Sequence, residues 1–283
     1  MDISGSTRVF MILGHPVAQV RAPEVFNALF RKHGVDAVLV PAQVAPQRFE
    51  GFVKQVLGAD NIDGLWLTIP HKTPMVALLD HCDAAGRLVG AVNAVRRNAD
   101  GSLEGALFDG AGFVKGLARF GIPTIGRRVL VVGVGGGGVA IAAAIAQRGC
   151  AELALFDAAP GRAGWVADQL SAAFNRPVTA AASADPAGFD LVVNATPLGL
   201  QPGDPLPFDV ARLDRSAAVV DILMKNQPTA LLRACAARGI TAHPGFEMML
   251  QQMPDYLNFF GLHELAHVVQ EDASEVRALL EPG

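Results

Sequence analysis

The chain has 283 residues, enough for two domains with separate hydrophobic cores. Because 51% of its residues are hydrophobic and 18% are charged, the composition is typical of a globular protein and excludes a largely disordered one. A net charge of −4 offers no electrostatic footprint for nucleic acid, so no nucleic-acid partner is expected.

The first part of the chain, up to about residue 107, is predicted to alternate strands and helices. Apolar runs bounded by turn residues predict strands, and apolar residues repeated on one helical face predict helices. Asp100 and Gly101, between two short apolar runs, favour a hairpin turn. The expected strands are 9–14, 37–42, 64–69, 92–96 and 103–107, and the expected helices are 23–33, 48–57, 74–79 and a connecting helix at 109–120.

A glycine-rich turn follows the next apolar run, which we predict to be a buried strand over 128–133. Three of its glycines have the G-x-G-x-x-G spacing of dinucleotide-binding turns, in which they permit a tight turn, a close approach of the pyrophosphate and close helix packing. The N-terminal amides of the following helix, expected over 139–148, then point at the phosphates. The residues expected to bind the cofactor here are Gly133, Val134, Gly135, Gly136, Gly137 and Gly138.

An acidic residue, Asp157, ends the next predicted strand, 152–156, about twenty residues after the glycine turn. A carboxylate at this position accepts hydrogen bonds from a ribose 2′-hydroxyl and repels a 2′-phosphate, so the sequence favours NAD over NADP. Arg162 follows five residues later and could in principle contact a phosphate, but we interpret it as an exposed residue that opens a helix.

Two more β-branched runs, 191–194 and 218–221, suit strands buried in a parallel sheet. After Gly245 two helices are expected to close the chain, and the first should return to the N-terminal region. We therefore predict an α/β protein with two domains. A Rossmann dinucleotide-binding domain spans 109–244, and a smaller, discontinuous α/β substrate-binding domain combines 1–108 with 245–283.

The compartment is predicted from three cysteines and from the N-terminus. Cys82, Cys150 and Cys235 are odd in number and widely spaced, which indicates reduced thiols rather than a disulfide framework or a metal site. The N-terminus lacks a basic region followed by an apolar core, and no apolar run reaches membrane-spanning length. A cytoplasmic protein without a membrane partner is expected.

A series of short motifs, taken in order, resembles the shikimate dehydrogenase family over nearly the whole chain. Each motif is short, but six or seven in the same order are specific. They are Gly14-His-Pro-Val-Ala18 with Pro23, Thr68-Ile-Pro-His-Lys72, Gly90-Ala-Val-Asn93, Asp109-Gly-Ala-Gly-Phe113, Asn194-Ala-Thr-Pro-Leu-Gly199, Asp221 with Thr229-Ala-Leu-Leu232, and Gly245-x-x-Met248 with Gln252.

The resemblance implies that Lys72 and Asp109 are a catalytic pair. Oxidising a secondary alcohol requires a hydride to leave carbon while a proton leaves oxygen; a lysine can take that proton, and a neighbouring carboxylate can orient the lysine and the hydroxyl. Taken outside the motif order, Lys72 would read as a solvent-facing lysine and Asp109 as a helix cap. The resemblance also implies substrate-binding positions at Thr68, Asn93 and Gln252, and cofactor-binding positions at Asn194, Thr196, Pro197, Ile222, Gly245 and Met248.

The chain departs from the family pattern at several substrate-contacting positions, where polar side chains are replaced by apolar or bulky ones. Such losses would cost several kcal/mol if the same substrate bound in the same way. Arg21 could supply a new carboxylate anchor, although its position matches the variable middle residue of the family's Ser-x-Ser. The replacing residues are Val20 and Ala22 for the two serines, Trp66 for an asparagine, Leu107 and Phe108 for Asn-Thr, and Met224 for a tyrosine.

One further motif, His263-Glu-Leu-Ala-His267, fits the H-E-x-x-H pattern of zinc enzymes. A pattern with two free positions arises by chance, and few residues follow it to supply a third ligand from a separate element. We interpret it as the polar face of a C-terminal helix and expect no metal.

Together these features predict an NAD-dependent oxidoreductase similar to shikimate and quinate dehydrogenases of aromatic amino acid biosynthesis. It would act on the secondary alcohol of a cyclic polyol or hydroxy acid, as a monomer or homodimer. An NAD-binding sensor that kept the fold is an alternative, although it would need no proton-transfer pair. A methylene-tetrahydrofolate-type dehydrogenase would require a tyrosine partnered with a lysine, and the single tyrosine, Tyr256, comes late in the chain.

Overall fold

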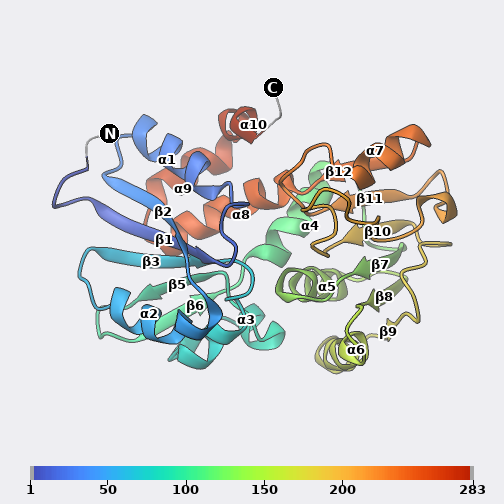
Figure 1. Cartoon of the computed structure of the whole chain (residues 1–283), viewed down its shortest axis with the longest axis horizontal. Helices are drawn as coiled ribbons and strands as arrows, with labels where there is room; N and C mark the ends of the chain where they lie inside the picture. The colour runs from blue at the N-terminus through green and yellow to red at the C-terminus, as the bar shows by residue number, and fades with distance from the viewer. Residues whose placement is uncertain (1–2, 281–283) are drawn as a thin grey trace. The chain divides into compact units, whose positions relative to one another are not determined.

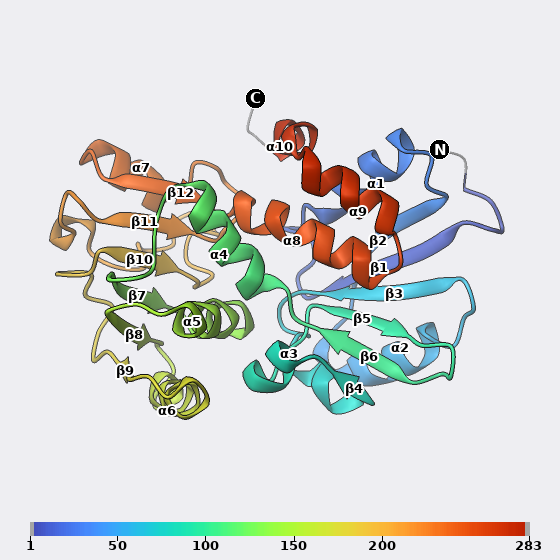
Figure 2. The ribbon, with the colours of Figure 1, turned by 180° about the vertical axis from the view of Figure 1, so that it is seen from behind.

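The computed structural model describes residues 3–280, which divide into two compact units. Unit 1 contains Met1–Phe108 and Gln252–Gly283, and unit 2 contains Asp109–Gln251. Each unit has a six-stranded sheet with helices packed on it (Figures 1 and 2). The chain is therefore an α/β protein in which the first unit is interrupted by the second, as the predicted fold class requires.

The sheet of unit 1 has the strand order β2-β1-β3-β5-β6-β4. β1 pairs in parallel with β2 and β3, whereas β5 pairs antiparallel with β3 and β6. The β5–β6 hairpin turns at Asp100 and Gly101, as predicted. The strands of this sheet are β1 (Arg8–Gly14), β2 (Ala37–Gln43), β3 (Ile62–Leu67), β4 (His81–Cys82), β5 (Ala94–Arg97) and β6 (Leu103–Ala106).

The helices of unit 1 come from both ends of the chain. α1 buries Val25, Phe26, Leu29 and Phe30, the spacing of one helical face. The helices are α1 (Ala22–Lys32), α2 (Phe49–Val56), α3 (Ala84–Val89), α9 (His263–Glu271) and α10 (Ser274–Leu280), with the C-terminal part of α8 (Phe246–Phe259) and two 3-10 helices, η1 (Pro46–Arg48) and η2 (Pro74–Leu78).

Alternate residues of the central strands pack on opposite faces of this sheet, because side chains alternate along a strand. On one face the rings of Phe10 and Trp66 stack with centroids 6.1 Å apart. On the other face Leu13 and Leu65 pack in the core that includes Phe49 of α2. The first face carries the aromatic cluster of unit 1: Phe10, Phe26, Phe30, Trp66, Phe108, Tyr256, Phe259 and Phe260.

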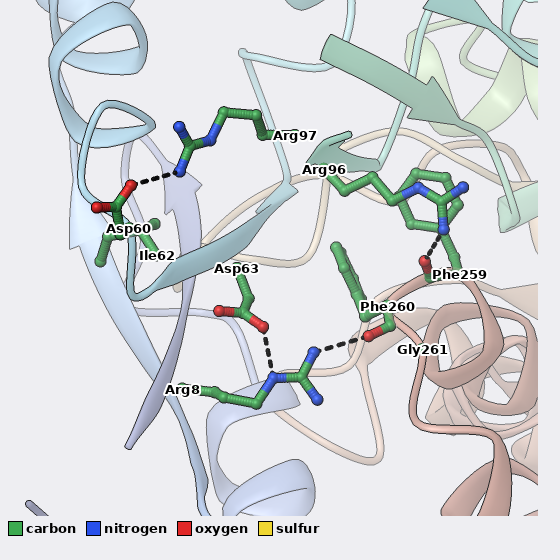
Figure 3. Close-up of a pocket in the computed structure, with 9 residues that line it drawn as sticks. All are labelled: Arg8, Asp60, Ile62, Asp63, Arg96, Arg97, Phe259, Phe260 and Gly261. Carbon is green, nitrogen blue, oxygen red and sulfur yellow. Dashed lines mark hydrogen bonds and ion pairs between the residues drawn. The ribbon is translucent and has the colours of Figure 1, made fainter. Parts of the chain in front are cut away.

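Two arginines fix the C-terminal end of α8 to the sheet (Figure 3). Arg8 forms an ion pair with Asp63 and donates from Nη2 to the carbonyl oxygen of Phe260 at 2.9 Å. Arg96 donates to the carbonyl oxygen of Phe259, and its guanidinium carbon lies 4.6 Å from the centroid of that ring. Cations at a helix C-terminus satisfy its last carbonyls and oppose its dipole. Arg8 and Arg96 also line a cavity of about 310 Å³.

The sheet of unit 2 has the order β12-β11-β10-β7-β8-β9, and all five pairings are parallel. This is the order of a Rossmann fold, which reverses between β7 and β10. The strands are β7 (Arg128–Val132), β8 (Glu152–Phe156), β9 (Val178–Ala180), β10 (Leu191–Asn194), β11 (Ala218–Asp221) and β12 (Thr241–Pro244). Residues 245–251, at the start of α8, belong to unit 2.

Helices cover this sheet, and two of them approach closely. A Cβ on Gly110 of α4 would lie 2.3 Å from the carbonyl oxygen of Ala140 of α5, so only glycine permits this packing distance. On the other side of the sheet, β11 and α7 share a core built around Val219 and Leu231. The helices are α4 (Asp109–Arg119), α5 (Gly136–Arg148), α6 (Arg162–Phe174), α7 (Ala230–Ala237) and the 3-10 helix η3 (Val210–Arg212).

The structure differs from the sequence predictions mainly in short elements. α5 begins at Gly136 rather than at residue 139, because the last glycines of the turn form its first turn. β3 ends at Leu67, so residues 68 and 69 lie in the following loop. Between Gly245 and residue 280 there are three helices rather than two. The elements given no range from the sequence include β4, α3, β9, β12 and η3, of two to six residues each, which are too short for a periodic pattern. The eight-residue helix α7 was given no range either.

Candidate cofactor and substrate sites

The glycine turn of unit 2 connects β7 to α5. Gly133 has φ +92°, and a Cβ there would lie 2.8 Å from backbone atoms of Ala195 and Thr196. A Cβ on Gly138 would lie 1.9 Å from the carbonyl oxygen of Gly133. At Gly135 a Cβ would meet nothing within 4 Å. Close packing therefore requires the first and third glycines, whereas the second faces open space in which a phosphate can approach the backbone.

Asp157 follows β8 and is hydrogen-bonded to the glycine turn. Its Oδ2 accepts the N–H of Val134 at 2.8 Å, and its Oδ1 accepts the N–H of Ala159 at 2.9 Å. Each carboxylate oxygen has a further lone pair, so the group can also accept a ribose hydroxyl. Arg162, the first residue of α6, donates from Nε to the carbonyl oxygen of Val134 at 3.0 Å. Arg162 is exposed, as expected, but this contact with the turn was not predicted.

A second loop, residues 194–199, follows β10 beside the glycine turn. The buried Asn194 accepts from the backbone N–H of Thr196 at 3.1 Å and from its Oγ1 at 2.7 Å. Pro197 is exposed at the tip of this loop. The loop after β11 begins at Ile222, whose backbone leaves room only for glycine at Gly245, because a Cβ there would lie 2.6 Å away. Met224 is half-buried in the loop after β11, and Met248 is buried in the first turn of α8.

These groups in unit 2 fit a bound dinucleotide. The glycine turn and the 194–199 loop lie at the carboxyl ends of β7 and β10, where the strand order reverses and such ligands bind. The open face at Gly135 and the N-terminus of α5 offer backbone amides to a pyrophosphate. The carboxylate of Asp157 offers acceptors to a ribose. Unit 2 thus has the donors and acceptors that a nicotinamide dinucleotide needs.

In unit 1 the loop after β3 carries Thr68 and Lys72. Its backbone is held from three sides: Thr68 N–H donates to Leu13, Ile69 accepts from His15, and the carbonyl oxygen of Lys72 accepts from Val92 at 3.0 Å. Lys72 itself is half-buried. Backbone hydrogen bonds therefore attach this loop to the end of β1 and to the segment before β5.

His71 is a further anchor of this loop that the sequence did not reveal. The imidazole is fully buried, hydrogen-bonded from Nε2 to the carbonyl oxygen of Val44 at 2.7 Å, and stacked on Phe49 with centroids 4.2 Å apart. Burial lowers the pKa of His71, so the ring is neutral at pH 7 and donates through Nε2. It ties the lysine-bearing loop to the segment between β2 and η1.

Two predicted substrate-binding residues come together in unit 1, although 159 positions separate them. Asn93 Nδ2 donates to Oε1 of Gln252 at 3.3 Å, and both side chains are buried. Asn93 also accepts from the N–H of Phe108 at 3.1 Å through Oδ1. Tyr256 donates from its hydroxyl to the backbone oxygen of Asn93 at 3.2 Å. Tyr256 comes late in the chain, and one turn of α8 places it beside Gln252.

Of the residues that depart from the family pattern, Val20, Ala22, Trp66, Leu107 and Phe108 lie in unit 1, whereas Met224 lies in unit 2. Trp66 is 3% exposed within the aromatic cluster, and its indole N–H has no hydrogen-bond partner among the described residues. Val20 and Ala22, before and at the start of α1, are half-buried. Arg21, between them, pairs with Glu24 one turn later, Nη2 to Oε2 at 3.1 Å. An anion at this place would therefore compete with Glu24 for the guanidinium.

Asp109, the other half of the predicted catalytic pair, belongs to unit 2, whereas Lys72 belongs to unit 1. Asp109 opens α4 and is 3% exposed. A carboxylate in the first turn of a helix is stabilised by the helix dipole. The close contact of Gly110 with α5 fixes the place of Asp109 within its unit.

The H-E-x-x-H segment forms the start of α9. His263 Nδ1 lies 3.0 Å from Oδ1 of Asn258, and His267 pairs with Glu271 at 3.3 Å. Among the side chains that the structure describes, no three from His, Cys, Asp or Glu are grouped as ligands of a metal ion. The helices of residues 3–280 are each too short or too polar to cross a lipid bilayer.

Comparison with known proteins relates both units to one family. The family model of the shikimate dehydrogenase substrate binding domain matches residues 12–95. A shikimate dehydrogenase (NADP(+)) from Rubrobacter xylanophilus is 39% identical over 255 residues, 88% of this chain and 89% of that protein.

Two solved structures extend the likeness to the fold of nearly the whole chain. Shikimate 5-dehydrogenase from Listeria monocytogenes, in complex with shikimate and NAD, has a TM-score of 0.82 at 26% identity, covering 96% of this chain and 98% of that one. Quinate dehydrogenase from Corynebacterium glutamicum, in complex with NAD, has a TM-score of 0.79 at 28% identity, covering 94% and 99%.

Proposed function

Because this chain belongs to the shikimate dehydrogenase family of nicotinamide-dependent oxidoreductases, we propose that it transfers a hydride between NAD and a secondary alcohol of a shikimate- or quinate-like cyclic compound. In this proposal unit 2 binds the cofactor and unit 1 binds the substrate. The observation that carries it is Asp157, which accepts the amide of Val134 in the glycine turn and the amide of Ala159 in its own loop, and keeps lone pairs for a ribose hydroxyl.

The choice of NAD rests on the charge of Asp157. A ribose 2′-hydroxyl can donate to this carboxylate, whereas a 2′-phosphate would be repelled by it. The relative from Rubrobacter xylanophilus is named for NADP(+), while the Listeria and Corynebacterium structures hold NAD. Arg162 is the residue that could favour NADP, since its guanidinium is held at Val134. A single substitution at Asp157 therefore tests the assignment.

The proposed chemistry divides between the two units. Bound NAD supplies the hydride acceptor. The residues of the chain bind and orient the alcohol and remove its proton: Lys72 takes the hydroxyl proton, and Asp109 orients the lysine and the hydroxyl. Thr68, Asn93 and Gln252 bind further hydroxyl groups of the substrate through their hydroxyl and amide atoms.

The substrate assignment is supported by the relatives, two of which are named for shikimate and one for quinate. The apolar side chains of Val20, Ala22 and Trp66 in unit 1, however, offer fewer polar contacts to such a substrate than the family pattern does. A substrate that needs several polar contacts there would bind weakly, because apolar side chains cannot replace its hydrogen bonds to water. We therefore expect shikimate itself to be a poor substrate.

A dehydrogenase screen tests the proposal. The purified protein is assayed at 340 nm with NAD and NADP against shikimate, quinate, amino-substituted analogues and uncharged cyclic polyols, and with NADH and NADPH against the ketone dehydroshikimate. Turnover of one of these alcohols with NAD supports the proposal. Tight NAD binding without turnover of any of them would instead favour a sensor that has kept the fold.

A further inference from the structure

We propose that the buried carboxylate of Asp221 is a positioning residue for the cofactor, because it fixes the two loops that pack against the glycine turn. This inference rests on the proposed binding of NAD to unit 2. Asp221 is the last residue of β11 and is 0% exposed.

Both oxygens of this carboxylate are hydrogen-bonded to groups from different segments. Oδ1 accepts from Asn194 Nδ2 at 3.0 Å and from the N–H of Leu223 at 3.3 Å. Oδ2 accepts from Oγ1 of Thr229 at 2.6 Å. Asp221 thus joins the ends of β10 and β11 to the start of α7. Burial raises the pKa of the Asp221 carboxyl, and the hydrogen bonds from Thr229, Leu223 and Asn194 oppose that rise.

The bond from Asn194 sets the orientation of its amide. Because Nδ2 donates to Asp221, Oδ1 faces the opposite way and accepts both donors of Thr196. Thr196 Oγ1 in turn accepts the N–H of Leu198 at 3.2 Å. A chain of hydrogen bonds therefore runs from the buried carboxylate into the 194–199 loop.

That loop is in direct contact with the glycine turn. Backbone atoms of Ala195 and Thr196 lie 2.8 Å from the place of a Cβ on Gly133, and the Cβ of Ala195 lies 3.2 Å from the place of one on Gly138. A displacement of this loop would therefore alter the contact surface of the turn that is proposed to hold the pyrophosphate.

The bond to Leu223 fixes the other loop in a similar way. Ile222, between Asp221 and Leu223, has its Cδ1 3.7 Å from the place of a Cβ on Gly137. Its backbone also packs against Gly245 at the start of α8. One buried carboxylate therefore holds two neighbours of the glycine turn, and neither is adjacent to the turn in sequence.

The prediction is that removing the carboxylate weakens NAD binding beyond its effect on stability. Asp221→Ala should raise the Kd for NAD by about tenfold or more, equivalent to about 1.4 kcal/mol, measured by calorimetry at a temperature where the variant is folded. Asp221→Asn keeps an acceptor toward Asn194 and Leu223, so it should restore the Kd to within about threefold of the parent protein's value.

Thr229→Val is the matched control. It removes the bond to the other oxygen and the N-cap of α7, since Thr229 Oγ1 also accepts the N–H of Leu232 at 3.2 Å. It should lower Tm, because a lost cap and hydrogen bond cost about 1–2 kcal/mol, yet leave the Kd for NAD nearly unchanged. A merely structural role for Asp221 would make Kd follow Tm across all three variants.

Asn194→Ala breaks the same link from its other end, and it decides the matter if Asp221→Ala does not fold. It should raise the Kd to a similar extent, and the Asn194→Ala/Asp221→Asn double variant should lose no more than Asn194→Ala alone. A folded Asp221→Ala or Asn194→Ala protein with unchanged NAD affinity would overturn the inference, as would an equal loss in Thr229→Val. Failure of the unsubstituted protein to bind NAD would overturn the proposed function and, with it, this inference.

Discussion

The two units offer ligands different kinds of group. In unit 2 the predicted contacts are mostly backbone: the glycine turn, the N-terminus of α5 and the loop at Thr196. In unit 1 they are side chains, among them the amides of Asn93 and Gln252. A backbone site depends on close packing, which a Cβ disrupts, whereas a side-chain site changes with each substitution while the fold persists. The cofactor side is thus constrained and the substrate side is free to diverge.

The aromatic cluster shows how such divergence is accommodated in unit 1. Trp66 has the place that the family pattern gives to an asparagine, and it packs among Phe26, Phe10 and Tyr256. The ring buries apolar surface that stabilises the unit, at the cost of one indole N–H without a partner among the described residues. Stability and substrate recognition can therefore change together at this position.

The largest expected effect comes from the proposed proton-transfer residue of unit 1. Lys72→Ala should lower kcat on the best substrate found by roughly 10²–10⁴-fold, the usual loss for a positioned acid–base group. The Kd for NAD should stay the same, because the lysine acts on the alcohol. Lys54→Ala, which removes an exposed lysine paired with Glu50, is the control and should be neutral. Undiminished turnover in Lys72→Ala would reject the mechanism.

Two glycine substitutions test the claim that unit 2 is constrained by packing. Gly138→Ala places a Cβ 1.9 Å from the carbonyl oxygen of Gly133 and should cost about 1–3 kcal/mol of unfolding free energy, together with NAD binding. Gly135→Ala meets nothing within 4 Å, so it should change the stability by less than about 0.5 kcal/mol. It should still weaken NAD binding, because its methyl group stands where the phosphate approaches.

Thermal unfolding and NAD titration of the two glycine variants separate these effects. Loss of affinity in Gly135→Ala without loss of stability identifies the open face of the turn as the binding face. Equal NAD affinity in Gly135→Ala and the unsubstituted protein would show that the phosphates bind elsewhere, and the comparison between the units would fail.

The features that could be predicted from the sequence are those encoded by residues close together in the chain. The glycine turn, Asp157 and the hairpin at Asp100 and Gly101 depend on residues close together in the chain, and the structure forms the turn and the hairpin where they were predicted. The roles of the site residues remain predictions. In both units the strand order and the short elements depend on packing between distant segments, which periodicity does not encode.

The contacts that were missed join distant segments. Tyr256 reaches Asn93 across 163 positions, and Arg162 reaches Val134 across 28. His71 finds its acceptor at Val44 only because β2 and the loop after β3 are both attached to β1. Each is a polar side chain whose partner is set by the folded sheet, so no local pattern in the sequence distinguishes it from a surface residue.

A smaller effect is expected at Asp157, where the cofactor site of unit 2 does depend on a side chain. Asp157→Asn removes the negative charge while keeping an oxygen acceptor for one of the two amides. The ratio of the Kd values for NADP and NAD should fall by about tenfold, or 1.4 kcal/mol. Titration of both cofactors by fluorescence measures it, and adding Arg162→Leu to this variant should remove the gain in NADP affinity. Equal binding of NAD and NADP by the unsubstituted protein would contradict the role of Asp157.

The smallest expected effect is a partial return of polar contacts to unit 1. The double substitution Val20→Ser/Ala22→Ser places two hydroxyl groups before and at the start of α1, where the family pattern has Ser-x-Ser. One net hydrogen bond contributes about 0.5–1.5 kcal/mol, so for each bond that the two serines form, the KM for shikimate should fall by roughly two- to tenfold, with little change in kcat. Val20→Ala, which enlarges the space without adding a hydroxyl, should not reproduce the gain. If the double variant gains nothing, the bulk of Trp66 and Phe108, rather than the missing hydroxyls, decides which substrates unit 1 accepts, and Trp66→Asn becomes the substitution that should admit shikimate.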